Sequence, residues 1–295
     1  MIEFGDNMIL ITGLTGFSGT AFYKVLCREN YKEKIRVLVR PTTDLNMFEN
    51  SPLDIELVEG DILDKPSLKK AIKDCDTVFH IAAKDLARPL VEAIDEENRQ
   101  IKCIFVSSTI VYSNYYRTSY LKTDEKDYIK IFQKNDLPYV FIRPTMIFGS
   151  TADRNISVFV NWLKKFKFFP IVKKGEATIR PVHREDLAEA YYLILKNFDN
   201  LKQKEYVVSG ERDMTLLEMF KIISEKGGFK NIFINIPFPL AKLAVNFVYL
   251  ISLKKIDFRE KLDRLTENRA YDNSVIKEEL GFTPTSFEER IEKMI

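Results

Sequence analysis

Histidine and cysteine are scarce in this chain of 295 residues, which contains two histidines and three cysteines. Cys27, Cys75 and Cys103 follow no metal-binding or CxxC spacing, and an odd number of cysteines fits no simple disulfide framework. His80 and His183 are too few for a histidine-rich metal site. We therefore expect no metal centre, and we expect reduced cysteines in a cytoplasmic protein.

The chain also lacks a strong charge of one sign, internal repeats and low-complexity tracts. Its net charge is +2 at pH 7, and no run of lysines is long enough for a tail that binds nucleic acid. Met1–Asn7 carries two acidic residues and no long apolar run, so it does not resemble a signal peptide. We expect no nucleic-acid partner.

No apolar run is long enough to cross a membrane. Leu240–Leu253 is the most apolar stretch, but it has 14 residues and is interrupted by Lys242 and Asn246. Lys242, Asn246 and Tyr249 fall on one helical face, and nearly all other positions are apolar. This pattern predicts a buried helix of a small lobe. The alternative is a surface helix that touches lipid or a lipid-linked substrate.

Short apolar runs alternate with segments able to form helices, such as Thr20–Glu29 and Ser67–Asp74, in the first half of the chain. The runs are mostly apolar on both parities, as expected for strands covered on both faces. This alternation predicts an α/β fold with a doubly wound parallel sheet. The expected strands are Met8–Thr12, Ile35–Arg40, Ile55–Glu59, Thr77–Ile81, Cys103–Ser107 and Tyr139–Arg143.

Three glycines spaced three apart follow the first expected strand and open the first expected helix. Thr12–Gly19 reads Thr-Gly-Leu-Thr-Gly-Phe-Ser-Gly. This spacing permits a tight turn, close approach of a pyrophosphate, and close packing of helix against strand. The phosphates would lie against free N–H groups at the positive end of the helix. We interpret the segment as a dinucleotide-binding loop; the alternative is a tight turn alone.

The pattern changes after Gly149. A basic and aromatic stretch, Asn161–Lys174, precedes an expected helix at Glu185–Asn197 and an expected strand at Glu205–Val208. The remainder reads as mainly helical. We therefore expect a dinucleotide-binding domain formed by residues 1–149 and 181–208. A smaller, mainly helical substrate-binding lobe would be formed by residues 150–180 and 209–295.

The TGxTGFxG loop resembles that of the extended and atypical short-chain dehydrogenase/reductase family, which includes nucleotide-sugar epimerases, dehydratases and reductases. The resemblance implies a Rossmann fold and continues in order along most of the chain. The matching segments are Gly60–Ile62 at the adenine edge, His80–Ala83 beside the cofactor ribose, Phe105–Tyr112 with the catalytic Ser or Thr, Arg143–Gly149 near the nicotinamide, Pro181–Ala188 in the VHxxDxA pattern, and Tyr271–Asp272 with Leu280–Pro284 near the C-terminus.

The resemblance implies that Ser108 and Tyr120 are catalytic residues. It also implies that Arg180, which precedes the VHxxD segment, binds a substrate diphosphate, since guanidinium groups recognise phosphates bidentately. The implied cofactor contacts are Gly13, Thr15, Gly16, Phe17, Ser18, Gly19, Asp61, Ile62, Ala82, Ala83, Ser107, Pro144, Thr145 and Met146.

Arg40 ends the second expected strand, where a member of the family that prefers NAD would usually carry an acid. An arginine there can pair with the 2′-phosphate of NADP through two charged hydrogen bonds. We therefore favour NADP as the cofactor, with NAD as the alternative. A solvated arginine at a strand end is the simpler interpretation of the same residue.

One catalytic position departs from the family pattern. The family places a lysine four residues after the tyrosine, where it holds the ribose and lowers the tyrosine pKa. Asp124 occupies that position after Tyr120, and a nearby carboxylate disfavours the phenolate. The literal YxxxK pair, Tyr192–Lys196, falls in a later expected helix, and we interpret it as coincidental.

These features support three hypotheses. The first is an NAD(P)-dependent oxidoreductase or epimerase that acts on a nucleotide-linked sugar, with a homodimer as one form of assembly. The second is a non-catalytic dinucleotide-binding sensor or structural subunit, favoured by Asp124 and by short loops beside the nicotinamide. The third is a reductase of another small carbonyl compound, because this fold hosts many chemistries.

Overall fold

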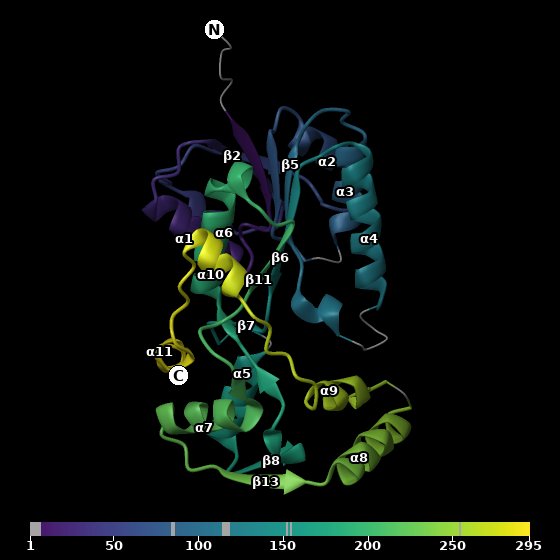
Figure 1. Cartoon of the computed structure of the whole chain (residues 1–295), viewed down its shortest axis with the longest axis vertical. Coiled ribbons are helices and arrows are strands. Elements are labelled where there is room, and N and C mark those ends of the chain that lie inside the picture. The colour runs from purple at the N-terminus through teal and green to yellow at the C-terminus, as the bar shows by residue number, and fades with distance from the viewer. Residues whose placement is uncertain (1–6, 84–85, 114–118, 152, 154, 254) are drawn as a thin grey trace. The chain divides into compact units, whose positions relative to one another are not determined.

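The computed structural model describes residues 7–83, 86–113, 119–151, 153, 155–253 and 255–295, with the backbone alone for residues 119–122. The chain forms two compact units (Figure 1). Unlike the division expected from the sequence, the sheet-containing unit includes Asn273–Phe282. The assignment of cofactor and substrate to separate parts stays a prediction. Unit 1 comprises Met1–Pro144, Leu187–Val208 and Asn273–Phe282, and unit 2 comprises Thr145–Asp186, Ser209–Asp272 and Thr283–Ile295.

Unit 1 is built on a sheet of seven parallel strands in the order β11-β6-β5-β4-β1-β2-β3. Ile9, Leu10 and Ile11 of β1, an interior strand, are fully buried, because both faces of the sheet are covered. The predicted doubly wound α/β fold is confirmed, and each expected strand ends within one residue of its predicted bounds. The strands are β1 (Met8–Thr12), β2 (Lys34–Val39), β3 (Ile55–Glu59), β4 (Thr77–His80), β5 (Lys102–Val106), β6 (Tyr139–Pro144) and β11 (Glu205–Val208).

Helices cover both faces of this sheet (Figure 1). On one face, Phe22 and Tyr191 pack with ring centroids 5.6 Å apart. On the other, α2 begins after Asp64, whose carboxylate accepts the N–H of Ser67 at 2.9 Å, and Pro66 lies in its first turn. The first face carries α1 (Gly19–Arg28), α6 (Arg184–Lys196) and α10 (Ser274–Leu280), and the second carries α2 (Lys65–Ile72), α3 (Ala87–Asp95) and α4 (Ser119–Lys134). Short 3-10 helices lie at Asn46–Phe48, Thr109–Tyr112 and Phe198–Asn200.

Unit 2 combines helices with strands that pair two by two. Its core gathers the side chains of Phe148, Phe169, Met219, Phe220 and Ile223. The helices are α5 (Ile156–Lys165), α7 (Leu216–Lys226), α8 (Phe238–Ile251), α9 (Arg259–Arg264) and α11 (Phe287–Glu292), with a 3-10 helix at Lys173–Gly175. The strand pairs are β7 (Ile147–Phe148) with β10 (Val182–His183), β9 (Thr178–Ile179) with β12 (Met214–Thr215), and β8 (Phe168–Val172) with β13 (Ile232–Ile236).

Helix α8 corrects one expectation. The apolar composition of Leu240–Leu253 predicted a buried helix, but none of the residues of α8 is buried. Leu243 is 67% exposed and Leu250 is 63% exposed. The prediction is wrong because burial depends on what packs against a helix, and too little of unit 2 covers this one. Within the described ranges, no helix combines the length and the apolarity needed to cross a membrane.

Candidate functional site

The three glycines of the phosphate loop lie at the carboxyl end of β1, and two of them are enclosed by backbone. Gly13 has a φ of +79°, and a Cβ atom there would lie 2.5 Å from the backbone nitrogen of Ala82. A Cβ on Gly19 would lie 2.2 Å from the carbonyl oxygen of Gly13. Gly16 is exposed, and its N–H donates to the Gly13 carbonyl at 2.9 Å. The loop therefore requires glycine at its first and third positions and leaves the second open to a ligand.

Helix α1 starts directly behind this loop. Its N-terminal backbone is tied to the loop, since the N–H of Thr20 donates to the Gly16 carbonyl at 2.9 Å. The Ser18 side chain does not cap the helix and instead accepts a hydrogen bond from the Tyr191 hydroxyl at 3.4 Å. Thr15 and Phe17 are half-buried beside these residues. The positive end of α1 thus faces the loop, as anion binding requires.

A buried contact between β1 and β4 brings Ala82 to the loop. The Thr12 hydroxyl lies 2.8 Å from His80 Nδ1, and both side chains are buried. The Thr12 carbonyl also accepts the N–H groups of Ile81, at 2.9 Å, and Ala82, at 3.1 Å. Burial lowers the pKa of His80 to about 4, so this histidine is neutral at pH 7. The structure thus brings Gly13 and Ala82 together, as the dinucleotide interpretation requires, and Ala83 lies exposed at the same edge.

The predicted adenine-side residues follow β2 and β3. Arg40 is exposed immediately beyond β2, and within the described ranges its guanidinium has no hydrogen-bonding partner. Asp61 shapes the turn after β3, where its carboxylate accepts the N–H of Leu63 at 2.8 Å. Ile62 is half-buried against the core of α2 to α4. Because β1, β2 and β3 are parallel neighbours, these residues lie at the same edge of the sheet as the phosphate loop.

Ser108 lies just beyond the carboxyl end of β5. Its hydroxyl oxygen accepts the N–H of Ile110 at 3.2 Å and so caps the 3-10 helix Thr109–Tyr112. This contact matches the ordinary structural role of a serine at a strand end. The hydroxyl hydrogen remains available to a ligand, because the contact with Ile110 uses only the oxygen as acceptor.

A buried charge network surrounds the neighbouring Ser107. The Ser107 hydroxyl donates to Glu125 of α4, and the Arg143 guanidinium forms an ion pair with Glu125 at 2.6 Å. Arg143 also contacts Glu205 of β11 at 2.9 Å and lies 5.4 Å from the Tyr112 ring centroid. Burial acts to lower the pKa of Arg143, but the two carboxylates hold it above its ordinary value.

This network engages the hydroxyl of Ser107, which donates to Glu125. The place of Ser107 beside the cofactor stays a prediction. Glu125 was missed altogether, because nothing in the segment around it marks it as the partner of Arg143. Tyr112 donates to Glu205 at 2.9 Å, and burial raises the pKa of its phenol to about 12. These contacts anchor β5, β6 and α4 beneath the predicted nicotinamide edge.

The predicted catalytic tyrosine lies outside the residues whose side chains are described. Tyr120 falls in the first turn of α4, where the backbone alone is described. Asp124, four residues later, forms an ion pair with Arg88 of α3. Arg88 was not singled out from the sequence. The carboxylate that stands in place of the family lysine is therefore neutralised by a guanidinium from the neighbouring helix.

The turn after β6 holds the last predicted cofactor residues. The Pro144 carbonyl accepts a hydrogen bond from the Thr109 hydroxyl at 3.3 Å. Within unit 2, the Thr145 hydroxyl donates to the Arg180 carbonyl at 2.5 Å, and the Met146 carbonyl accepts the N–H of Val182 at 3.0 Å. The hydroxyl hydrogen of Thr145 is therefore used within the protein, by the Arg180 carbonyl.

Arg180 is held by its own unit. Its Nε donates to the Gly210 carbonyl at 3.0 Å, one terminal nitrogen donates to the Glu211 carbonyl at 2.8 Å, and the other lies 3.4 Å from the Asp272 carboxylate. These contacts give Arg180 a role in holding residues 210 and 211. Its role as a ligand of a substrate diphosphate stays a prediction.

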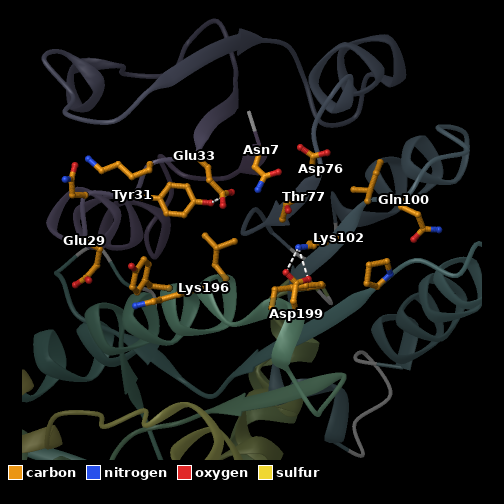
Figure 2. Close-up of a pocket in the computed structure, with 17 residues that line it drawn as sticks. Asn7, Glu29, Tyr31, Glu33, Asp76, Thr77, Gln100, Lys102, Lys196 and Asp199 are labelled. Atoms are coloured by element: carbon orange, nitrogen blue, oxygen red, sulfur yellow. Dashed lines mark hydrogen bonds and ion pairs between the residues drawn. The ribbon is translucent and has the colours of Figure 1, made fainter. Parts of the chain in front are cut away.

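A polar hollow of about 660 Å³ lies at the opposite edge of the sheet, beside the amino ends of β4 and β5 (Figure 2). Lys102 and Asp199 point toward each other there, with a separation of 2.7 Å. Tyr192 and Lys196, the literal YxxxK pair, line this hollow. The pair therefore lies away from the phosphate loop, which agrees with its interpretation as coincidental. Dinucleotides bind at the carboxyl ends of such sheets, so this hollow is not the candidate site.

Metal ligands do not gather in the described part of the chain, where no group of three or more His, Cys, Asp or Glu side chains could hold an ion. A doubly wound parallel sheet with a backbone-enclosed glycine loop at the carboxyl end of its first strand defines a dinucleotide-binding α/β protein. Residues 9–209 match the NAD dependent epimerase/dehydratase family, and the chain belongs to this family. The resemblance seen in the sequence is confirmed.

Similar proteins cover most of the chain. It is 21% identical to short-chain dehydrogenase/reductase family 42E member 1 of Danio rerio, over 96% of this chain and 86% of that protein. It is 26% identical to a putative UDP-glucose 4-epimerase of Methanocaldococcus jannaschii, over 76% of this chain and 83% of that protein. The crystal structure of dTDP-glucose 4,6-dehydratase from Bacillus anthracis in complex with NAD shares the fold, with a TM-score of 0.71 and 18% identity over 98% of this chain and 95% of that chain.

Proposed function

We propose that this chain is an NAD(P)-dependent oxidoreductase or epimerase that acts on a nucleotide-linked sugar. The observation that carries the proposal is the phosphate loop, where backbone atoms enclose Gly13 and Gly19 while Gly16 stays exposed. This arrangement suits the close approach of a pyrophosphate to main-chain N–H groups. The nucleotide sugars in the names of the M. jannaschii relative and the B. anthracis structure support the substrate class.

Different residues of the chain would bind the cofactor, orient the substrate and transfer the proton. The loop Gly13–Gly19 would bind the pyrophosphate, and the N-terminal end of α1 would stabilise the negative charge of the pyrophosphate. When bound, the nicotinamide supplies the hydride chemistry. Ser108 would orient a substrate oxygen with its free hydroxyl hydrogen, and Tyr120 would give or take the proton of that oxygen. The Arg143–Glu125 pair would position the segment that carries Ser108, because Glu125 also accepts the hydroxyl hydrogen of the adjacent Ser107.

We propose NADP as the preferred cofactor. Arg40 supports this choice, because its exposed guanidinium lies directly after β2 and is free, within the described ranges, to pair with a 2′-phosphate. NAD is the alternative, in keeping with the name of the family. The cytoplasmic location and the homodimer stay predictions.

A non-catalytic dinucleotide-binding protein is the second candidate, and Asp124 favours it. The family lysine would stand at this position, but here a carboxylate is paired with Arg88. Without a lysine at this position, the Tyr120 phenol would lack the cation that usually favours its ionised form.

Mass spectrometry of the small molecules that co-purify with the protein would test the proposal. We expect a dinucleotide and a nucleotide sugar. Turnover of a panel of nucleotide sugars would then be compared between the protein and Tyr120→Phe, which should lose turnover and keep its affinity for the cofactor. A bound dinucleotide with no retained or converted nucleotide sugar would replace the proposal by the second candidate. Absence of dinucleotide binding would overturn both.

A further inference from the structure

Helix α8 turns an apolar side toward solvent. Its outward side chains include Leu240, Leu243, Phe247, Leu250 and Ile251, each between 57% and 67% exposed. On another side the helix meets its own unit, where the guanidinium carbon of Arg259 lies 3.8 Å from the centroid of the Tyr249 ring. A helix on the surface of a soluble protein usually shows the reverse arrangement, with polar residues outward.

The exposed apolar surface continues onto the neighbouring strands. β13 leads into α8 and pairs in parallel with β8, with Ile232 opposite Phe168. Phe168 is 56% exposed, and Ile232 and Ile234 are each more than 40% exposed. Trp162 and Phe166, at the end of α5, are exposed to a similar degree. We use the term apolar face for the exposed apolar side chains on α5 and at its end and on β8, β13 and α8. Exposed apolar side chains in such number on neighbouring elements are typical of an interaction surface.

A hollow of about 550 Å³ lies behind α8. Ala241, Ala244 and Val245 of α8 line it on one side, and Phe159 and Trp162 of α5 line it on another. Every other lining side chain is apolar except that of Lys261. The hollow therefore lies between α8 and the elements α5 and β8.

Lysines accompany the apolar face, and acids do not. The two segments that form it, residues 155–175 and 227–256, contain no Asp or Glu. Lys173 lies over Phe238, with its Nζ 5.1 Å from the ring centroid. A face that mixes exposed apolar side chains with cations alone suits a partner that is negative at its surface and apolar beneath. Among the described residues, the lysines are Lys164, Lys165, Lys167, Lys173, Lys174, Lys230, Lys242 and Lys255.

We propose that the apolar face of unit 2 docks onto an anionic lipid bilayer. Helix α8, with 14 residues and a length of about 21 Å, would lie in the plane of the interface with its leucines among the acyl chains. The lysines would contact the lipid headgroups. A second copy of the chain fits less well, because it would bring the same positive charge to the contact. This inference goes beyond the proposed function and does not depend on it.

Co-flotation of the full chain with vesicles tests the proposal. We expect binding to vesicles of phosphatidylcholine mixed with phosphatidylglycerol, and little binding to phosphatidylcholine alone. Higher salt should weaken it, because the headgroup contacts are exposed to solvent. The variant Leu243→Ser/Leu250→Ser should lower the binding constant by on the order of tenfold for each leucine. Replacing Lys164, Lys165 and Lys167 by Gln should lower it by about fivefold for each lysine.

Leu63→Ser is the matched control, because Leu63 of unit 1 is 64% exposed and lies outside the apolar face. This variant should float like the unmodified protein. Circular dichroism should show that the leucine variant keeps its fold, since the replaced side chains point to solvent. Equal binding to neutral and anionic vesicles would overturn the proposal, as would equal binding by the leucine variant. If the unmodified protein did not float with vesicles but formed a dimer, and the leucine variant were a monomer, the apolar face would be a self-association surface instead.

Discussion

The guanidinium of Arg88 on α3 forms an ion pair with the carboxylate of Asp124 on α4. Asp124 stands four residues after Tyr120, where a cation would be expected. The pair means that no unpaired negative charge lies at this position. Both side chains are partly exposed, 44% for Arg88 and 28% for Asp124, so water screens the attraction.

A charge swap should reveal this pair. Asp124→Lys should lower the free energy of unfolding by about 1 kcal/mol, because it removes an attraction and opposes two cations. Adding Arg88→Asp to that variant should recover most of the loss. Urea unfolding of the two variants and of the unmodified protein measures the difference. If the double variant were no more stable than Asp124→Lys alone, the two charges would not interact.

Gly13 should not tolerate a side chain. Gly13→Ala forces a positive φ on alanine and places its Cβ 2.5 Å from Ala82, so we expect a loss of about 3 kcal/mol or more in unfolding free energy. Dinucleotide affinity, measured by calorimetry, should fall as well. Gly228→Ala is the control: its φ is +64°, but no atom lies within 4 Å, so it should lose about 1 kcal/mol. Equal losses would show that φ alone, and not the approach of Ala82, requires glycine.

The two carboxylates around Arg143 should differ in their effect on stability. Glu125 is 12% exposed and Arg143 is 6% exposed, so Glu125→Ala leaves a buried cation short of a partner and should cost about 3 kcal/mol. Glu205 is 51% exposed, so Glu205→Ala should cost less than about 1 kcal/mol. Urea unfolding at pH 7 compares them. A larger loss from Glu205→Ala would contradict the assignment of Glu125 as the main partner.

Protonation of His80 in the unfolded chain should lower the free energy of unfolding in mild acid. The pKa of His80 is about 4 in the folded chain and about 6.5 unfolded, so the unfolded state binds more protons between these values. Lowering the pH from 7 to 5 should therefore cost about 2 kcal/mol from this histidine. His80→Asn keeps a polar group near Thr12 but does not titrate, so its loss over this interval should be smaller by that amount. Urea unfolding at the two pH values measures both, and parallel losses would refute the assignment.

Arg40 should decide the choice of cofactor. Arg40→Asp should weaken NADPH by about ten- to hundredfold, because it removes charged hydrogen bonds to the 2′-phosphate and adds a repelling charge. NADH should change much less. Lys130→Asp is the control, since Lys130 is an exposed cation on α4, 74% accessible, and should affect neither cofactor. Calorimetric titration that finds equal affinity for the two cofactors in the unmodified protein would refute the preference for NADP.

Local chemistry made the sheet and the phosphate loop predictable. Most strands are short runs that are largely apolar on both parities, and this pattern favours a sheet covered on both faces. The loop was predictable for a similar reason, since Gly13, Gly16 and Gly19 lie within seven residues. Glycine is required there because of close backbone contacts such as that of Gly13 with Ala82.

Contacts between distant segments were decided by the tertiary structure alone. Glu125 and Arg88 look like ordinary helix-surface charges, and their partners become known only when α3, α4 and β6 come together. Neither β8 nor β13 was expected from the sequence, and the two strands pair across 64 residues. Composition predicted that α8 would be buried, but a helix is buried only where other elements cover it. What an apolar segment packs against is a property of the folded chain, and here the fold leaves its leucines in solvent.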